Sequence, residues 1–558
     1  MKKLLAAILL CAATAQAVET LRPDQLQAGQ KGYGLSVFKG TTPQRFEVEI
    51  LGVLQNAFPK QDMILIRMSG AGLEQHKVIA GMSGSPIYID DKLIGALAYG
   101  WSFENEPLAG VTPIHNMLAE VNRAAPRPVA ALDKRCEPEN RDYQSRLQPV
   151  LTPLALAGFS PRTIAAMAGD FEKLGLLLVA AGSGGGTNQA PGKLVAGGAV
   201  GVQLIRGDFN ATGVGTVTHI EGNRVLAFGH PFFLGGQIRA PAVEAEVHTI
   251  MSSMDRSFKM ASARGPTGAM IGDWQSCIVV DTQASAPMIP VAISVANRTT
   301  DHHETYAMEV LNNERLSPVF VRAALMEAAS TATGSSEDTT VRVTLEAETA
   351  TRTLKVENTF FNPGGGVAAM AAWQPVVDLF RSPFGDPVIK RITAKVDAVQ
   401  ARHTAEIKSA YFTRSEAERG NPVPLHITVK PFGKPETTFT VPIPVPAALD
   451  SMRLLNVAVL AGEDAPADIA PPDSQADYLD AIEKQHRNTE IVVLVRHPGQ
   501  SLRYRGKLLK NLPPSALAVL DDTSSTDITG APDIEQIVVP TEWVITGRAV
   551  ARIPIRQE

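Results

Sequence analysis

The sequence predicts a mainly β protein, and two observations carry this prediction. Short runs with alternating apolar residues, such as 34–38 and 46–51, recur along the chain, and a period of two is typical of strands with one buried face. Glycine and proline, at 45 and 39 of the 558 residues, separate these runs as turns between short strands require. Because one hydrophobic core stops growing well below this length, we expect several domains.

The first 17 residues are typical of a secretory signal peptide. Lys2 and Lys3 precede the apolar run 4–13, and Ala15-Gln16-Ala17 offers a cleavage site of the small-x-small type. Elsewhere no apolar run reaches the roughly eighteen residues that span a bilayer. The sequence therefore predicts an extracytoplasmic protein, periplasmic or secreted, with no transmembrane segment after signal removal.

Charge and cysteine usage exclude some classes of protein. Removing the signal deletes two lysines and no acids, so the formal net charge changes from -5 to -7. This mild acidity offers no basic surface for nucleic acid. Cys136 and Cys277 remain in the mature chain; they could pair in an oxidising compartment, but two cysteines are not a disulfide framework.

We expect the chain to divide into consecutive segments. Residues 125–150 are rich in proline and charge, as linkers are, and 182–186 are rich in glycine. The expected segments are the signal peptide 1–17, a serine-containing half of the core 18–125, a linker with a short helix and Gly-rich loop 126–194, a histidine-containing half of the core 195–290, a β-rich accessory module 291–450, and a C-terminal α+β or β-rich module 451–558. Helices are expected after the caps Thr112-Pro113 and Ser160-Pro161, at Ser317-Pro318 and near Ser474.

The stretch Gly81-Met82-Ser83-Gly84-Ser85-Pro86 carries the clearest chemical signal. A serine nucleophile needs a base and N–H donors aimed at the oxyanion, and glycines on both sides let nearby amides converge. An α/β-hydrolase elbow requires a helix after the serine, whereas the runs 87–89 and 92–97 predict a β-hairpin. The pattern fits the trypsin-type arrangement, with Ser83 as nucleophile and the amides of Gly81 and Ser83 as oxyanion hole. An ordinary β-turn with incidental serines is the alternative.

A second hairpin delivers a histidine at a strand end. The strand-like runs 213–218 and 225–228 flank the turn 221–223, and Gly229-His230-Pro231 follows directly. A histidine exposed by a tight turn is available as a general base. His76 and His115 are more typical of surface or cap positions, and His219, on the strand side of the same hairpin as His230, is a weaker candidate for the base.

Taken together, the two segments resemble the SpoIVB family, the sporulation-type serine peptidases of the chymotrypsin-like clan. The resemblance lies in 81–87 with 92–96 for the serine, and in 213–216 with 226–230 for the histidine. It implies a chymotrypsin-like double β-barrel core. Beyond about residue 290 the resemblance says nothing, but short strands with frequent turn signals there indicate β-sandwich-like accessory modules. The resemblance also implies hydrolysis of a polypeptide substrate through an acyl-enzyme, with Ser83 as nucleophile and His230 as base.

Two features depart from the pattern of that family. His230 follows Ser83 in the chain, whereas the sporulation members have the opposite order, and Met68 stands where the family carries its acid. The acids that could substitute in space are Asp62, Asp208, Asp255 and Asp273. The alternative function is therefore a catalytically inactive relative that acts as an extracytoplasmic binding or envelope protein with a protein partner.

No motif predicts a metal or another cofactor. His302-His303-Glu304 lacks the second histidine of a zincin helix, and the Gly-rich loop 182–186 lacks the Lys-Ser/Thr pair of a phosphate-binding loop at the required spacing. The oligomeric state is left open by the sequence.

Overall fold

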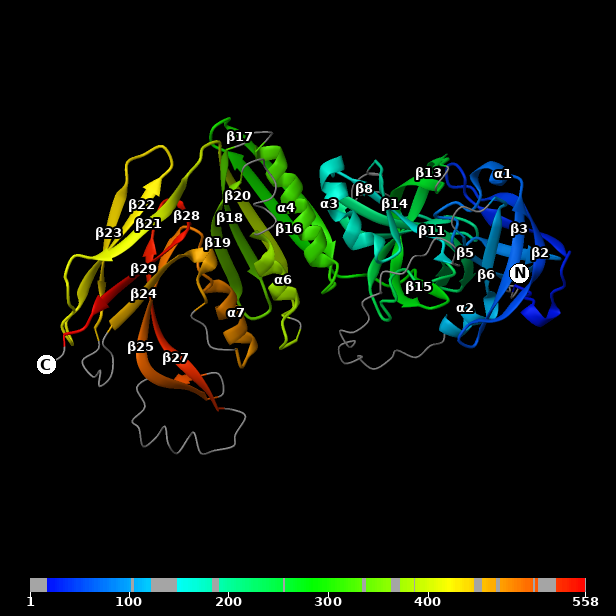
Figure 1. The fold of residues 1–558 in the computed structure, drawn as a ribbon. Coiled ribbons are helices and arrows are strands. Elements are labelled where there is room, and N and C mark those ends of the chain that lie inside the picture. The colour runs from blue at the N-terminus through cyan, green and yellow to red at the C-terminus, as the bar shows by residue number, and fades with distance from the viewer. Residues whose placement is uncertain are drawn as a thin grey trace, which may run out of the picture. The chain divides into compact units, whose positions relative to one another are not determined.

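A computed structural model describes residues 18–101, 105–121, 148–182, 190–253, 256–333, 338–362, 372–385, 387–445, 454–467, 472–504, 507–509 and 528–556. The chain forms two compact units, Met1–Pro287 and Met288–Glu558 (Figure 1). Asp255, Cys136 and most of the Gly-rich loop lie outside the described residues. Within the described residues, no helix combines the length and apolar character needed to cross a membrane.

The first unit begins with a closed antiparallel barrel. Its strands follow one another around the barrel in the order β1-β2-β3-β6-β5-β4, and β4 pairs with β1 to close it. A core that includes Phe46, Ile66 and Leu97 fills the interior. The strands are β1 Lys31–Ser36, β2 Gln44–Phe58, β3 Gln61–Ser69, β4 Pro86–Ile89, β5 Lys92–Gly100 and β6 Leu108–Pro113. The short helices of this part are η1 Pro23–Gln25, α1 Leu73–His76 and α2 Ile114–Val121.

A second barrel repeats the same strand order. Its ring runs β10-β11-β12-β15-β14-β13, and β13 pairs with β10 to close it. The strands are β10 Ala199–Gly207, β11 Asn210–Glu221, β12 Arg224–Ala227, β13 Ala240–Met251, β14 Phe258–Trp274 and β15 Cys277–Asp281. The expected chymotrypsin-like double β-barrel is confirmed, and closure removes the unpaired strand edges that would invite aggregation.

Smaller elements connect the two barrels. Strand β7 Gln148–Pro149 pairs with β5, whereas β8 Thr152–Ala157 pairs with β11 and with β9 Leu176–Ala180. Helix α3 Pro161–Glu172 begins at the predicted place because Ser160 Oγ accepts the Thr163 amide at 3.4 Å and Pro161 occupies its first turn.

The second unit opens with a sheet in the order β17-β16-β20-β18-β19. Helix α4 Ser317–Thr333 packs on this sheet against β16, β17 and β20, and it contacts helix α6 Gln374–Phe380. The pairing of β16 with β20 is parallel, and the connection between them, which includes α4, has the length that a parallel pair needs. The strands are β16 Met288–Asn297, β17 His302–Leu311, β18 Thr339–Glu348, β19 Thr353–Asn362 and β20 Arg391–Val399.

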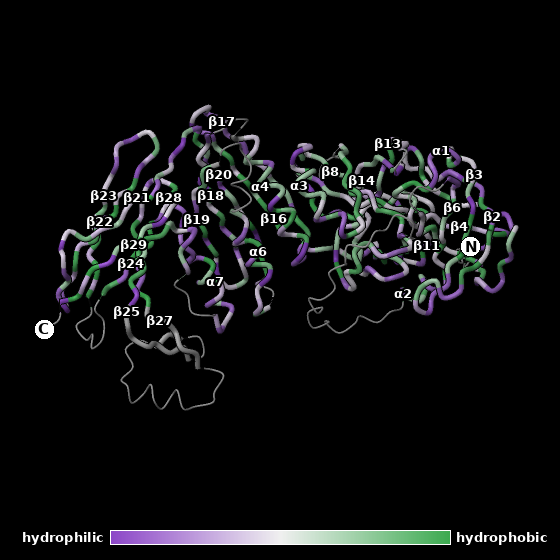
Figure 2. Tube along the Cα trace, in the orientation of Figure 1, coloured by the Kyte–Doolittle hydropathy of each residue, from purple (hydrophilic) through white to green (hydrophobic). Residues whose placement is uncertain are grey.

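The rest of the second unit contains two further sheets that share one hydrophobic core, as a β-sandwich does. Hydrophobic and hydrophilic residues mix along their strands (Figure 2), and in β22 fully buried residues alternate with less buried ones, as expected for a strand with one face on the core. One sheet has the order β23-β22-β21-β28, and the other β26-β25-β24-β29 with β27 on β25. The strands are β21 Thr404–Phe412, β22 Val423–Pro431, β23 Thr437–Ile443, β24 Leu454–Ala461, β25 Glu490–Tyr504, β26 Lys507–Leu509, β27 Ile528–Pro540, β28 Val544–Thr546 and β29 Arg548–Pro554, with η2 Gly462–Asp464 after β24.

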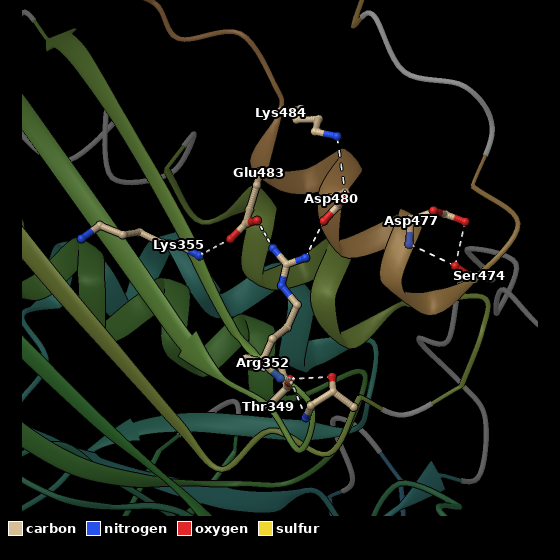
Figure 3. A network of polar contacts seen from close by, with 9 residues as sticks. Thr349, Arg352, Lys355, Ser474, Asp477, Asp480, Glu483 and Lys484 are labelled. Atoms are coloured by element: carbon tan, nitrogen blue, oxygen red, sulfur yellow. Dashed lines mark hydrogen bonds and ion pairs between the residues drawn. The ribbon is translucent and has the colours of Figure 1, made fainter. Parts of the chain in front are cut away.

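Helix α7 Gln475–Glu483 is fastened to the turn between β18 and β19 by Arg352 (Figure 3). The guanidinium group lies between Asp480 and Glu483 and pairs with both. The Lys355 amide adds a hydrogen bond to Glu483 Oε1 at 2.8 Å. The helix itself starts at the predicted cap, where Ser474 Oγ accepts the amide of the third helical residue at 3.1 Å.

Candidate active site

Ser83 lies on a tight turn, residues 81–86, which we call the serine turn. Gly81 and Gly84 have φ angles of 95° and 94°, a region that glycine enters without a steric penalty. The Gly84 amide donates to the Leu97 carbonyl at 2.7 Å, which fixes the turn on strand β5. The two glycines that flank Ser83 in the sequence are thus explained by the backbone conformation.

Two backbone amides of the serine turn, those of Gly81 and Ser83, take no part in its backbone hydrogen bonds with the described residues. Among the described residues, the amides of Met82, Gly84 and Ser85 donate the backbone hydrogen bonds of this turn, and those of Gly81 and Ser83 donate none. These two amides are the oxyanion donors expected from the sequence. Amides that are already oriented and not engaged elsewhere are the groups that stabilise an oxyanion in acyl transfer.

Strand β11 of the second barrel holds the serine turn from the other side. The Thr216 amide donates to the Ser83 carbonyl at 2.8 Å, and Thr216 Oγ1 donates to the Gly81 carbonyl at 2.9 Å. Thr218 Oγ1 donates to the Gly84 carbonyl at 2.7 Å. The position of Ser83 therefore depends on contacts between residues more than a hundred positions apart.

His230 lies on a turn that meets the serine turn at Leu97. The Leu97 carbonyl accepts the Gly84 amide, and it lies 3.3 Å from the place that a Cβ on Gly229 would occupy. Thr112 Oγ1 of the first barrel donates to the Gly229 carbonyl at 2.6 Å. The structure thus brings the predicted nucleophile segment and the predicted base segment together at the boundary of the two barrels.

The His230 ring is set up as a neutral base. Burial lowers its pKa to about 4, although the backbone carbonyls of Pro231 and Val150 act in the opposite direction. Its Nδ1 lies 2.7 Å from the Pro231 carbonyl. Since a carbonyl only accepts, the proton of the neutral ring resides on Nδ1, and Nε2 keeps a lone pair that can accept a proton.

The hydrogen bond of a working serine–histidine pair is not formed in this structure. Ser83 and His230 are 0% and 2% exposed. Both Ser83 Oγ and His230 Nε2 are buried and make no hydrogen bond with the described residues. Catalytic hydrogen bonds in enzymes without substrate are often long or misaligned and tighten only in the complex.

The acids offered by the sequence lie in different places. Asp62 of β3 accepts the Asn56 amide at 2.9 Å, Asp208 lies in the turn between β10 and β11, and Asp255 is outside the described residues. Met68, at the position where the family carries its acid, is buried in the core of the first barrel. None of these observations places a carboxylate on the His230 ring.

Asp273 does contact the loop that follows His230. Its carboxylate accepts the amides of Phe232, Phe233 and Gly235 at 2.6, 2.7 and 2.9 Å. Burial raises the pKa of Asp273, and these amide donors act in the opposite direction. The carboxylate therefore shapes the histidine loop, while the Pro231 carbonyl orients the ring.

Asp273→Asn is expected to lower the free energy of unfolding by about 1–3 kcal/mol, because the new NH₂ group faces amides that also donate. Urea unfolding of the purified variant measures the loss. Asp90→Asn, at an exposed turn position whose φ angle of 48° asparagine tolerates, is the matched control and should change stability by no more than about 0.5 kcal/mol. Equal effects of the two substitutions would contradict the role given to Asp273.

Lys259 of β14 lies behind the serine turn, and no sequence motif indicates it. The side chain is 0% exposed, and Nζ donates to Ser36 Oγ at 2.9 Å and to Thr216 Oγ1 at 3.2 Å. Burial lowers the pKa of Lys259 to about 7. The alternation of side chains along a strand could have indicated its burial, because Lys259, Ala261 and Ala263 occupy the inward-facing positions of β14.

Comparison with known proteins gave a match to the first barrel. A family model described as SpoIVB peptidase S55 matches residues 11–118, about a fifth of the chain. The matched segment contains the serine turn and ends before the His230 hairpin. No curated protein and no solved structure matched significantly. Within the described residues, no group of three or more His, Cys, Asp or Glu side chains could hold a metal ion.

Proposed function

We propose that this protein is an exported serine endopeptidase, because a family model described as SpoIVB peptidase S55 matches the segment that forms the first barrel. The observation that carries the proposal is the serine turn, where the amides of Gly81 and Ser83 donate no backbone hydrogen bond among the described residues and where the His230 turn meets the same Leu97 carbonyl. Export is proposed from the signal-like residues 1–17.

The proposed reaction proceeds through an acyl-enzyme. Ser83 Oγ attacks the carbonyl carbon of a peptide bond while its proton passes to His230 Nε2, and the amides of Gly81 and Ser83 bind the oxyanion. The intermediate collapses as the C–N bond breaks, and the proton on His230 goes to the leaving amine. Water then attacks the acyl-enzyme with His230 as base, which releases the carboxylate product and restores the Ser83 hydroxyl.

A second candidate function is that of a catalytically inactive relative which binds a protein partner outside the cytoplasm. The burial of Ser83 and His230, the missing hydrogen bond between them and the apolar Met68 at the expected acid position favour it. The two candidates differ in one property, the reactivity of the Ser83 hydroxyl.

Labelling with a fluorophosphonate probe distinguishes the two candidates. We expect the folded mature protein to become covalently labelled, with the label mapped to Ser83 by mass spectrometry of its peptides. Heat-denatured protein, which lacks the assembled site, is the control and should remain unlabelled. Absence of labelling would support the inactive relative, whereas a label on Ser85 in place of Ser83 would contradict the assignment of Ser83 as the nucleophile.

A further inference from the structure

Lys259 is joined to the serine turn by two chains of hydroxyl groups. In one, Lys259 Nζ donates to Thr216 Oγ1, which donates to the Gly81 carbonyl. In the other, Nζ donates to Ser36 Oγ at 2.9 Å, Ser36 Oγ lies 3.0 Å from Ser85 Oγ, and Ser85 Oγ lies 2.6 Å from the Met82 carbonyl.

The direction of the second chain follows from counting protons. The Ser85 hydroxyl has one proton, and the Met82 carbonyl can only accept, so the bond of 2.6 Å uses that proton. Ser85 Oγ also donates the contact of 3.0 Å to Ser36 Oγ, so the Met82 carbonyl and the Ser36 oxygen share one proton, and the Ser36 oxygen accepts from Lys259 Nζ as well. Because Lys259 occupies a lone pair of the Ser36 oxygen, that oxygen competes less strongly for the Ser85 proton, which stays on the shorter bond to the Met82 carbonyl.

The chain ends on the peptide group that carries an oxyanion donor. The Met82 carbonyl and the Ser83 N–H belong to the same peptide bond, so a hydrogen bond to the carbonyl makes that N–H a stronger donor. The aliphatic stem of Lys259 also packs beneath the turn, where a Cβ on Gly81 would lie 3.2 Å from Lys259 Cδ. The Lys259 amide fixes the same segment by donating to the Ala80 carbonyl at 3.0 Å.

We propose that Lys259 is a positioning residue of the peptidase site, which acts through Ser36 and Ser85 to orient and polarise the Ser83 amide of the oxyanion hole. The proposal rests on the proposed function. The Lys259 ammonium group donates to hydroxyls, those of Ser36 in β1 and Thr216 in β11, and not to a carboxylate. Burial lowers its pKa, and no charged side chain of the described residues contributes to the shift. A buried unpaired cation is costly, and its charge reaches the turn only through these hydroxyls.

The test compares the rate of fluorophosphonate labelling of Ser83 in the wild type and in Lys259→Met. We expect the variant to be labelled about 10-fold more slowly at pH 6, a fraction of the loss seen when an oxyanion donor is removed outright. Because Lys259 loses its charge near pH 7, the wild-type rate should fall as the pH rises above 7, and the two proteins should converge near pH 9. A role in packing alone would give a ratio that does not change with pH.

Two further variants complete the experiment. Ser36→Ala breaks the chain but keeps the lysine, and it should also lose the fall in rate above pH 7. Thr218→Val removes a different hydroxyl bond to the serine turn and should keep that fall, whatever its rate. Met fits the buried stem without a charge, so Lys259→Met should remain folded, as near-ultraviolet circular dichroism will report.

The possible failures are separable. Wild-type protein that does not label at Ser83 contradicts the proposed function itself. Wild-type protein that labels at Ser83, with a folded Lys259→Met variant of equal rate and equal pH dependence, contradicts only the role of Lys259.

Discussion

Replacing His230 with glutamine is expected to lower the rate of Ser83 acylation by at least about 10⁴-fold, the scale found when the base of a serine peptidase is removed. Glutamine occupies similar space, so the loss would reflect the missing proton acceptor and not a collapsed turn. The rate of fluorophosphonate labelling at pH 6, followed under pseudo-first-order conditions, measures the effect. A cooperative thermal transition at the same pH will show that the variant is folded.

The pH dependence of the wild type identifies the base further. His230 acts as a base only when neutral, so the rate should rise as the pH passes its pKa of about 4 and level off well below the value of about 6.5 that an exposed histidine has. The fall expected above pH 7 from Lys259 would then leave an optimum on the acidic side of neutrality. A rate that instead rises between pH 6 and 7 would contradict the buried, neutral ring.

The same pKa has a consequence for stability. The folded-state pKa of His230 is depressed below its unfolded value, so the unfolded chain binds more protons between about pH 4 and 6.5. The free energy of unfolding should therefore rise with pH across this window, by at most about 1.4 kcal/mol per pH unit from this one group. In His230→Gln this contribution disappears, so urea unfolding of the wild type and the variant across this pH range measures it directly.

Local signals predicted those parts of the molecule that depend on local chemistry. Ser160 and Ser474 mark helix starts because a capping hydroxyl acts within three residues, and the glycines around Ser83 reflect φ angles of one turn. The double barrel followed from strand patterning together with the resemblance of two motifs to one family.

Local sequence signals did not predict the contacts between residues that lie far apart in the sequence. Thr216 bonds the serine turn, and Asp273 bonds the amides after His230, only because closed barrels bring distant strands together. Lys259 is the clearest case, since nothing in a strand's alternation says that an inward lysine will meet hydroxyls and not a carboxylate. Which acid, if any, serves the histidine was equally a question of three-dimensional packing.

Gly84→Ala is expected to destabilise the first unit by about 3 kcal/mol or more and to abolish labelling of Ser83 with it. An added Cβ would lie 1.9 Å from the Thr216 carbonyl oxygen and 2.5 Å from the Phe228 amide nitrogen. Both atoms belong to the backbone of the second barrel, so relief requires the serine turn and β11 to separate. The φ angle of 94° adds strain for any residue with a side chain.

Gly29→Ala separates these two causes. Its φ angle of 87° imposes similar backbone strain, but nothing lies within 4 Å of the added Cβ, so it should cost only about 1–2 kcal/mol and leave labelling measurable. Urea unfolding of both variants, followed by tryptophan fluorescence, gives the comparison. If Gly84→Ala were no worse than Gly29→Ala, the tight fit of the serine turn against β11 would be refuted. That fit is what places the Ser83 carbonyl on Thr216 and the Gly81 carbonyl on its hydroxyl, so the proposed nucleophile, the oxyanion amides and the chain from Lys259 all depend on the absence of one methyl group.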